Sequence, residues 1–177
     1  LELIKKQYAS LTLSFLLVLC LFLVLFVYRN FIASKKHNKK LTYLASRDPL
    51  TNCYNRRSLF EAMNKYLTNP DLDNEYCIMM IDIDHFKNVN DTYGHNKGDS
   101  VICGFASILQ SNIRESDIVA RFGGEEFCVI LHQMPYKKAM IIAENMRQKI
   151  ENSTFDNIKI TSSFGVTSLQ FGAFTPS

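Results

Sequence analysis

Residues 118–131 read IVARFGGEEFCVIL, and this stretch decides how the chain folds. Two short apolar runs, 118–122 and 127–131, flank the four residues Gly-Gly-Glu-Glu. Apolar runs of strand length on either side of a glycine-containing turn are typical of a β-hairpin. We therefore predict two antiparallel strands whose turn carries the two glycines together with Glu125 and Glu126.

Further strands and helices are predicted on both sides of this hairpin. The apolar runs at 76–82, YCIMMID, and at 158–169, IKITSSFGVTSL, have the length of strands. Apolar residues at helical spacing predict helices around residues 59–67, 98–113 and 139–150. The order helix, strand, helix, hairpin, helix, strand predicts an α+β, palm-like (ferredoxin-like) domain, with an antiparallel sheet and helices on one face of it.

Four acidic residues lie where two of these strands end. Asp82 and Asp84 close the apolar run at 76–82, and Glu125 and Glu126 occupy the hairpin turn. If the hairpin pairs beside that strand, the carboxylates converge into an oxygen-ligand site that suits Mg²⁺. Such a site serves phosphoryl or nucleotidyl transfer. Acidic residues at strand ends are more often solvated surface, so the surrounding pattern has to decide between the two interpretations.

The N-terminal part of the chain carries one long apolar run. Residues 11–28, LTLSFLLVLCLFLVLFVY, contain no charged side chain and would span about 27 Å as a helix, close to the thickness of a bilayer core. We interpret the run as a transmembrane helix. An uncleaved signal peptide is the alternative, disfavoured because no small-residue cleavage site follows. More basic residues follow the run than precede it, which predicts that the C-terminal part is cytoplasmic.

These features divide the chain into four parts: residues 1–10 as an N-terminal flank, 11–28 as the membrane helix, 29–47 as a juxtamembrane stalk, and 48–177 as the globular domain. The first 40 residues hold seven Lys or Arg and one acidic residue, so the rest is net acidic although the whole chain is +3. This balance argues against a nucleic-acid-binding face. The five cysteines show no metal-ligand spacing, which favours free thiols in a reducing cytosol.

Three blocks of sequence carry a family resemblance. RDPLTNCYNRR at 47–57, IDIDHFKNVNDTYGHNKGD at 81–99 and RFGGEEF at 121–127 closely resemble the signature blocks of GGDEF diguanylate cyclases, in order and at the expected separations. The resemblance implies a nucleotidyl cyclase palm domain that joins two GTP molecules into cyclic di-GMP and releases two pyrophosphates. It also implies a homodimer, since each domain resembles a half-site for one GTP, here anchored in the bacterial inner membrane.

The resemblance implies a metal site and a catalytic set. Asp82 and Glu125 would ligate Mg²⁺ or Mn²⁺ with help from the backbone carbonyl of Ile83, and Glu126 matches the second acidic position of the motif. The catalytic residues implied are thus Asp82, Glu125 and Glu126.

Substrate contacts follow from the same resemblance. Asn90 and Asp99 match positions that hydrogen-bond the guanine edge, and Lys87 matches the segment that contacts phosphate. Gly123 and Gly124 would leave room for a nucleotide near the main chain. Phe86 belongs to the same block, although core packing is its more ordinary role.

An inhibitory product site is implied by Arg114 and Asp117, which form the family's RxxD pattern shortly before the hairpin. Two rival functions remain open: a receptor that binds cyclic di-GMP through this pair without turnover, and a cyclase for another purine nucleotide. The sequence also departs from the family. Asn52 and Cys53 replace the usual Gly and Leu, and the chain stops at Ser177, before a further helix and a Lys/Arg pair that hold the triphosphate, so we expect a C-terminally incomplete domain.

Overall fold

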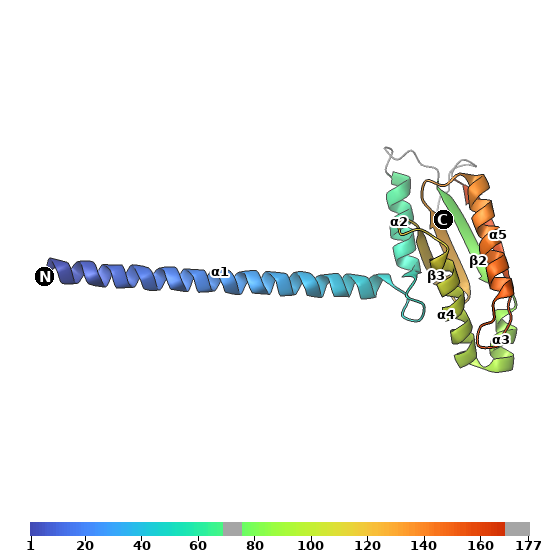
Figure 1. Cartoon of the computed structure of the whole chain (residues 1–177), viewed down its shortest axis with the longest axis horizontal. Helices are drawn as coiled ribbons and strands as arrows, with labels where there is room; N and C mark the ends of the chain where they lie inside the picture. Colours follow the sequence, from blue (N-terminus) through green and yellow to red (C-terminus); the bar gives the residue numbers. More distant parts are fainter. Residues whose placement is uncertain (69–75, 169–177) are drawn as a thin grey trace. The chain divides into compact units, whose positions relative to one another are not determined.

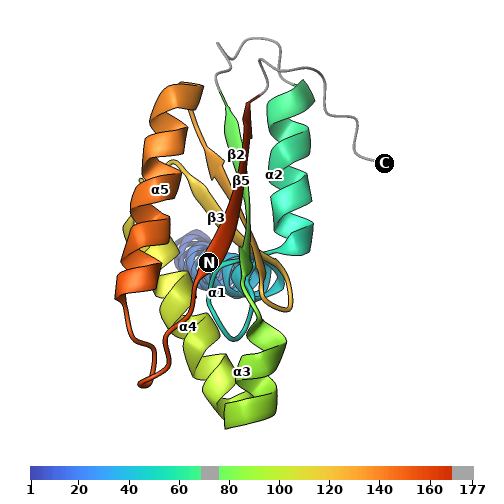
Figure 2. The same ribbon diagram turned by 90° about the vertical axis from the view of Figure 1, so that its right-hand side faces the viewer.

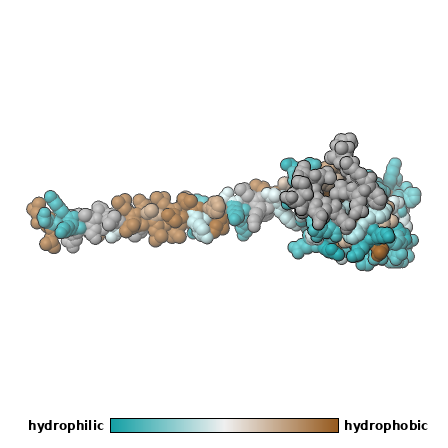
Figure 3. Space-filling model, turned by 90° about the horizontal axis from the view of Figure 1, so that it is seen from above, coloured by the Kyte–Doolittle hydropathy of each residue, from teal (hydrophilic) through white to brown (hydrophobic). Residues whose placement is uncertain are grey.

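The structure, a computed structural model, describes residues 1–68 and 76–168. The chain divides into two compact units, Leu1–Ala45 and Ser46–Ser177. The first unit is formed by helix α1 (Glu2–Ser46), which continues without a break through the predicted membrane run and the predicted stalk. Apolar side chains cover the visible face of its middle part (Figure 3), and its segment Ser14–Ser46 is long and apolar enough to cross a membrane.

The second unit is built around a five-stranded sheet with the order β1-β3-β4-β2-β5 (Figure 1). The predicted hairpin is present as β3 and β4, and the predicted central strand is β2. All neighbours are antiparallel except β1 and β3, which run parallel, so the sheet is mixed instead of purely antiparallel. The strands are β1 (Tyr54–Asn55), β2 (Cys77–Ile83), β3 (Ile118–Gly123), β4 (Glu126–Leu131) and β5 (Ser162–Ser168).

Helices cover both faces of the sheet, which corrects the expectation of helices on one face only. Helices α4 (His95–Ser111) and α5 (Tyr136–Asn152) lie on one side and α2 (Arg56–Thr68) lies on the other (Figure 2). The reason is visible in β4, where every residue after the first is buried. A strand with two buried faces needs a helix on each of them.

Each face has its own apolar cluster. On the α4 and α5 side, Phe127 of β4 packs its ring 5.2 Å from that of Phe105 on α4, centroid to centroid. On the α2 side, Leu59 packs with Cys128 and Ile130 of β4. Burial of these side chains supplies most of the favourable free energy that holds the sheet and helices together.

One helix was not predicted. Helix α3 (Phe86–Tyr93) follows β2 directly and buries only two of its eight residues, Phe86 and Val89. The following helix α4 also begins earlier than predicted, at His95, because α3 and α4 are separated by Gly94 alone. Gly94 has a φ of 84°, in the range that favours glycine, which allows the sharp change of direction between the two helices.

Candidate active site

The four strand-end carboxylates meet at one end of the sheet, and we call Asp82, Asp84, Glu125 and Glu126 the acidic edge. Strand β2 lies between β4 and β5, and in the antiparallel register Asp82 is directly opposite Glu126. The turn that joins β3 to β4 places Glu125 next to Glu126. The structure therefore brings together the carboxylates that the sequence predicted to converge.

The charges of the acidic edge act on one another. Burial raises the pKa of Asp82, and the neighbouring carboxylates of Glu125, Glu126 and Asp84 raise it further. A carboxyl pKa that is raised by neighbouring negative charges is typical of a site that binds a cation.

Asp84 is held in place by the start of strand β5 and by Thr161, the residue before it. Its two carboxylate oxygens accept hydrogen bonds from Thr161 Oγ1 at 2.6 Å and from Ser163 Oγ at 2.7 Å. Burial alone would raise the pKa of Asp84, but these two hydrogen bonds and the nearby His85 outweigh that effect and lower it. Sequence reasoning missed the roles of Thr161 and Ser163, although the hydroxyl residues Thr-Ser-Ser within the predicted strand 158–169 were a visible signal.

The glycine turn is open above its backbone. Gly124 has a φ of 50°, in the left-handed region that glycine adopts most easily. A β-carbon on Gly123 or Gly124 would meet no atom within 4 Å. A ligand can therefore approach the main chain of this turn closely.

An arginine that the sequence reasoning did not single out fixes this turn. Arg121 Nε donates to the carbonyl oxygen of Gly124 at 2.8 Å, and its Nη1 lies 3.2 Å from Oδ1 of Asp48. Burial works to raise the pKa of Asp48, but hydrogen bonds from Thr51 and the charge of Arg121 lower it overall. Arg121 thus connects the start of the globular unit to the turn that carries Glu125.

The predicted substrate residues lie on α3 and at the start of α4, which follow the acidic edge directly in the chain. Lys87 and Asp99 are exposed, and Asn90 is partly buried. Phe86, in contrast, is only 7% exposed and belongs to the apolar core. The structure therefore gives Phe86 the packing role, with no open face for a substrate.

The acidic edge fits a partial divalent-cation site. In the part of the chain that the structure describes, no three His, Cys, Asp or Glu side chains are grouped so as to hold a metal by themselves. Mg²⁺ in nucleotide sites is usually held by one or two carboxylates, with waters and substrate phosphates as its other ligands. Two clustered carboxylates and a strand-end carbonyl, that of Ile83, match this chemistry.

The predicted inhibitory pair forms a closed turn. Asp117 is buried, and its two carboxylate oxygens accept hydrogen bonds from the backbone N–H groups of Arg114 at 3.0 Å and His132 at 2.9 Å. Arg114 itself is exposed and lines a cavity of about 420 Å³. Arg47, Tyr54 and Gln110 also line this cavity. The aspartate therefore shapes the turn, and the arginine is available to a ligand.

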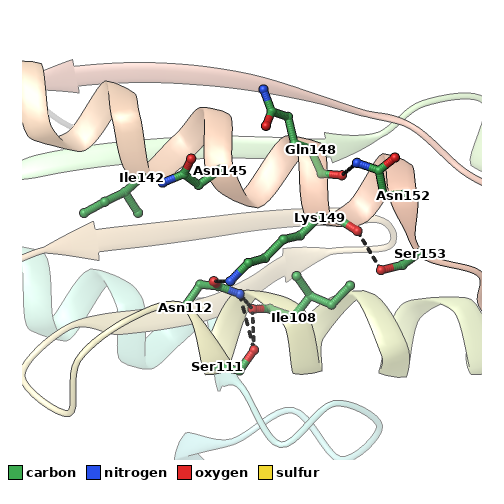
Figure 4. Close-up of a pocket in the computed structure, with 9 residues that line it drawn as sticks. All are labelled: Ile108, Ser111, Asn112, Ile142, Asn145, Gln148, Lys149, Asn152 and Ser153. Carbon is green, nitrogen blue, oxygen red and sulfur yellow. Dashed lines mark hydrogen bonds between the residues drawn. The ribbon is translucent and has the colours of Figure 1, made fainter.

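Two other cavities contribute less to the site. One of about 600 Å³ lies between α4 and α5, where Lys149 reaches across to Asn112 (Figure 4), and none of the predicted site residues lines it. Another, of about 680 Å³, lies beside α3 and includes Asp84 and Thr161 in its wall. The acidic edge is therefore identified by its carboxylates and its open turn, because these groups can bind a cation and phosphates without a deep cavity.

The fold and the acidic edge together define the class of this protein: a palm-like α+β domain with a carboxylate site at the end of its central strands. Comparison with known families makes the assignment specific. The chain belongs to the GGDEF family, since the family model described as "Diguanylate cyclase, GGDEF domain" matches residues 45–175. Diguanylate cyclases of this family use a divalent metal.

Two curated relatives come from Escherichia coli K12. The chain is 41% identical over 139 residues to "Probable diguanylate cyclase DgcT", covering 75% of this chain and 30% of the relative. It is 33% identical over 151 residues to "Diguanylate cyclase DgcM", covering 81% of this chain and 36% of the relative. The chain thus spans about a third of the length of these relatives.

Solved structures show the same fold. The coiled coil and GGDEF domain of DgcB from Caulobacter crescentus, in complex with c-di-GMP, matches with a TM-score of 0.72 at 27% identity and covers 77% of this chain and 76% of that one. Diguanylate cyclase SiaD from Pseudomonas aeruginosa, in complex with its activator SiaC, matches with a TM-score of 0.71 at 30% identity, covering 94% and 67%.

Proposed function

We propose that this chain is a diguanylate cyclase that condenses two GTP molecules into cyclic di-GMP and releases two pyrophosphates. The observation that supports this most is the acidic edge, in which Asp82 faces Glu126 across the β2–β4 pair beside an open glycine turn. Membership of the GGDEF family and the names of the two relatives point to the same reaction.

In the proposed reaction, the 3′ oxygen of one GTP attacks the α-phosphorus of the other. A new P–O bond forms, the bond from the α-phosphorus to the oxygen that bridges to the β-phosphate breaks, and pyrophosphate leaves, while the hydroxyl proton is lost to solvent. The same exchange then closes the ring. A divalent cation, Mg²⁺ or Mn²⁺, held by Asp82, Glu125 and the Ile83 carbonyl would neutralise phosphate charge and make the attacking hydroxyl more acidic. Glu126 would stand next to these ligands, and Lys87 would bind phosphate.

The protein's own residues would orient the nucleotide. Gly123 and Gly124 leave the turn open to the phosphates, while Asn90 and Asp99 would hydrogen-bond the guanine edge. A carboxylate at that edge accepts hydrogen bonds from the guanine N–H groups. Adenine presents no matching donors, so the site would reject ATP. A cyclase for another purine is the rival, and ATP that competes equally with GTP for turnover would favour it.

The proposal includes a homodimer in the bacterial inner membrane. One acidic edge serves one GTP, so two domains have to face each other for ring closure. Residues 11–28 of α1 would span the bilayer, residues 1–10 would flank it, and residues 29–47 would form a stalk that leads to a cytoplasmic domain from residue 48. Retention of the full chain in the membrane pellet after alkaline extraction tests the span, and release into the supernatant would contradict it.

Turnover is tested most directly with the purified full chain in detergent. Incubation with GTP and Mg²⁺ should yield cyclic di-GMP and pyrophosphate in a 1:2 ratio, the stoichiometry of the reaction. Binding of cyclic di-GMP without any pyrophosphate release would instead identify a receptor. That second candidate is supported by the exposed Arg114 at the 420 Å³ cavity, since an arginine can bind phosphate bidentately even where acidic residues such as Glu115 also line the cavity.

We predict that Arg114→Ala weakens cyclic di-GMP binding by roughly 10- to 100-fold, the loss expected for hydrogen bonds to a charged group. Because Arg114 lies outside the acidic edge, the initial rate of GTP turnover should stay unchanged. Equilibrium binding and initial rates measure the two effects separately. Arg57→Ala is the matched control, since Arg57 is an exposed arginine on α2 paired with Glu61. Equal product binding by Arg114→Ala and the parent chain would argue against an inhibitory site here.

A further inference from the structure

The side chain of Asn90 is held by packing. Asn90 lies on α3, and its side-chain amide makes no hydrogen bond to any residue that the structure describes. It rests instead against Gly98, the fourth residue of α4. Gly98 is buried, so this contact lies in the interface between α3 and α4.

The space beside Gly98 is already filled. A β-carbon added to Gly98 would overlap Oδ1 of Asn90 and would lie 3.1 Å from its Cγ and 3.2 Å from Cζ of Phe86. Real β-carbons essentially never come within 3.0 Å of another atom, so the overlap with Oδ1 would force the Asn90 amide to move. Phe86 is buried in the core and cannot move aside easily.

We propose that Gly98 is a positioning residue for guanine recognition, because the absence of its side chain creates the notch in which the Asn90 amide is seated between α3 and α4. Oδ1 of the amide lies against Gly98, so the shape of the notch sets the direction in which the rest of the amide faces a nucleotide base. Asp99, the other residue proposed to read the guanine edge, follows Gly98 directly in α4. The inference rests on the proposed function, since it takes Asn90 to contact guanine.

Helix propensity alone predicts that Gly98→Ala stabilises the protein, which makes this substitution informative. Alanine is a better helix former than glycine, so Gly98→Ala would stabilise α4 if nothing occupied the notch. The structure predicts that this gain is lost, because the new β-carbon would displace the Asn90 side chain and press on the buried ring of Phe86. Gly104 is the matched control, because it lies in the same helix and a β-carbon there would approach Cδ1 of Phe155 at 2.5 Å, away from Asn90.

The test measures binding of the α,β-methylene analogues of GTP and ATP to the full chain in detergent, together with the melting temperature of each variant. Gly98→Ala should bind the GTP analogue about tenfold more weakly, as expected when hydrogen bonds to the base are lost, with ATP-analogue binding unchanged. Gly104→Ala should lose stability yet keep the preference for guanine.

A double variant separates the notch from a general packing defect. Asn90→Ala removes the atoms that the new β-carbon would strike, so Asn90→Ala/Gly98→Ala should melt higher than Gly98→Ala and bind the GTP analogue no more weakly than Asn90→Ala. If Gly98→Ala keeps full guanine preference while Asn90→Ala loses it, the positioning role is wrong and the proposed function stands. If Asn90→Ala also keeps the preference, the assignment of Asn90 to guanine fails, and the inference fails with it.

Discussion

Asp82→Asn should reduce cyclase turnover by at least about 100-fold, the scale seen when a group that stabilises transition-state charge is removed, while the protein stays folded. The amide keeps the size of the carboxylate and its place in β2 opposite Glu126. It loses the negative charge that would bind the cation and, through it, the triphosphate. Turnover of GTP and the melting temperature, measured on the same preparations, check the two halves of this expectation.

The pKa of Asp82 determines the sign of the stability change. Burial first, and then Glu125, Glu126 and Asp84, raise this pKa above 3.8, so the folded protein disfavours the ionised form. Asp82 therefore lowers stability at neutral pH, and this penalty is relieved as the pH falls through the raised pKa. In buffer with a chelator at pH 7, Asp82→Asn should melt at the same temperature as the parent chain or higher.

Added metal should reverse this order. A cation that binds only the folded state raises the melting temperature, so Mg²⁺ or Mn²⁺ should stabilise the parent chain and leave Asp82→Asn nearly unchanged. Glu144→Gln serves as the control, because Glu144 is an exposed carboxylate on α5 that pairs with Arg147. It should leave turnover intact. Metal stabilisation of Asp82→Asn equal to that of the parent chain would remove Asp82 from the ligand set.

Local sequence patterns predict the elements that carry long apolar runs and fail for those that do not. The hairpin and β2 follow from apolar runs of strand length, and α2 and α5 follow from apolar residues at helical spacing, since burial imposes both patterns. Helix α3 has the sequence FKNVNDTY with two buried residues, which resembles a polar loop. Strand β1 has only two residues. Periodicity also could not show that β4 is covered on both faces, because a fully apolar run has no alternation to interpret.

The site shows the same division between local and tertiary information. Asp82 and Glu125 could be predicted to converge because each closes a recognisable strand or turn. The residues that hold the acidic edge in position could not be predicted, because the pairs are far apart in the sequence. Asp48 and Arg121 are separated by 73 positions, and Asp84 and Ser163 by 79. Such pairs depend on which strands become neighbours. Single-sequence reasoning therefore finds the carboxylates and misses the groups that hold them in position.

Arg121→Met should lower turnover by about tenfold or more and destabilise the domain by about 1–3 kcal/mol, the cost of leaving partly buried polar groups without partners. The side chains of Arg121 and Asp48 are only 17% and 18% exposed, so water cannot fully replace the lost contacts. Methionine keeps the bulk of the side chain but frees the carbonyl of Gly124, which loosens the turn that carries Glu125. Turnover and denaturant unfolding measure the two effects.

Two companion variants decide which contact of Arg121 matters for turnover. Asp48→Asn leaves the bond from Arg121 Nε to the Gly124 carbonyl in place, so it should lose stability while keeping most of the activity. Because both changes act on one network, Arg121→Met/Asp48→Asn should be little worse than Arg121→Met alone. Arg147→Met removes an arginine on α5 whose ion pairs with Glu144 and Glu151 lie outside the turn, and it should change neither property appreciably. If Asp48→Asn proves as inactive as Arg121→Met, the ion pair at the start of the globular unit, and not the hold on the glycine turn, controls the geometry of the acidic edge.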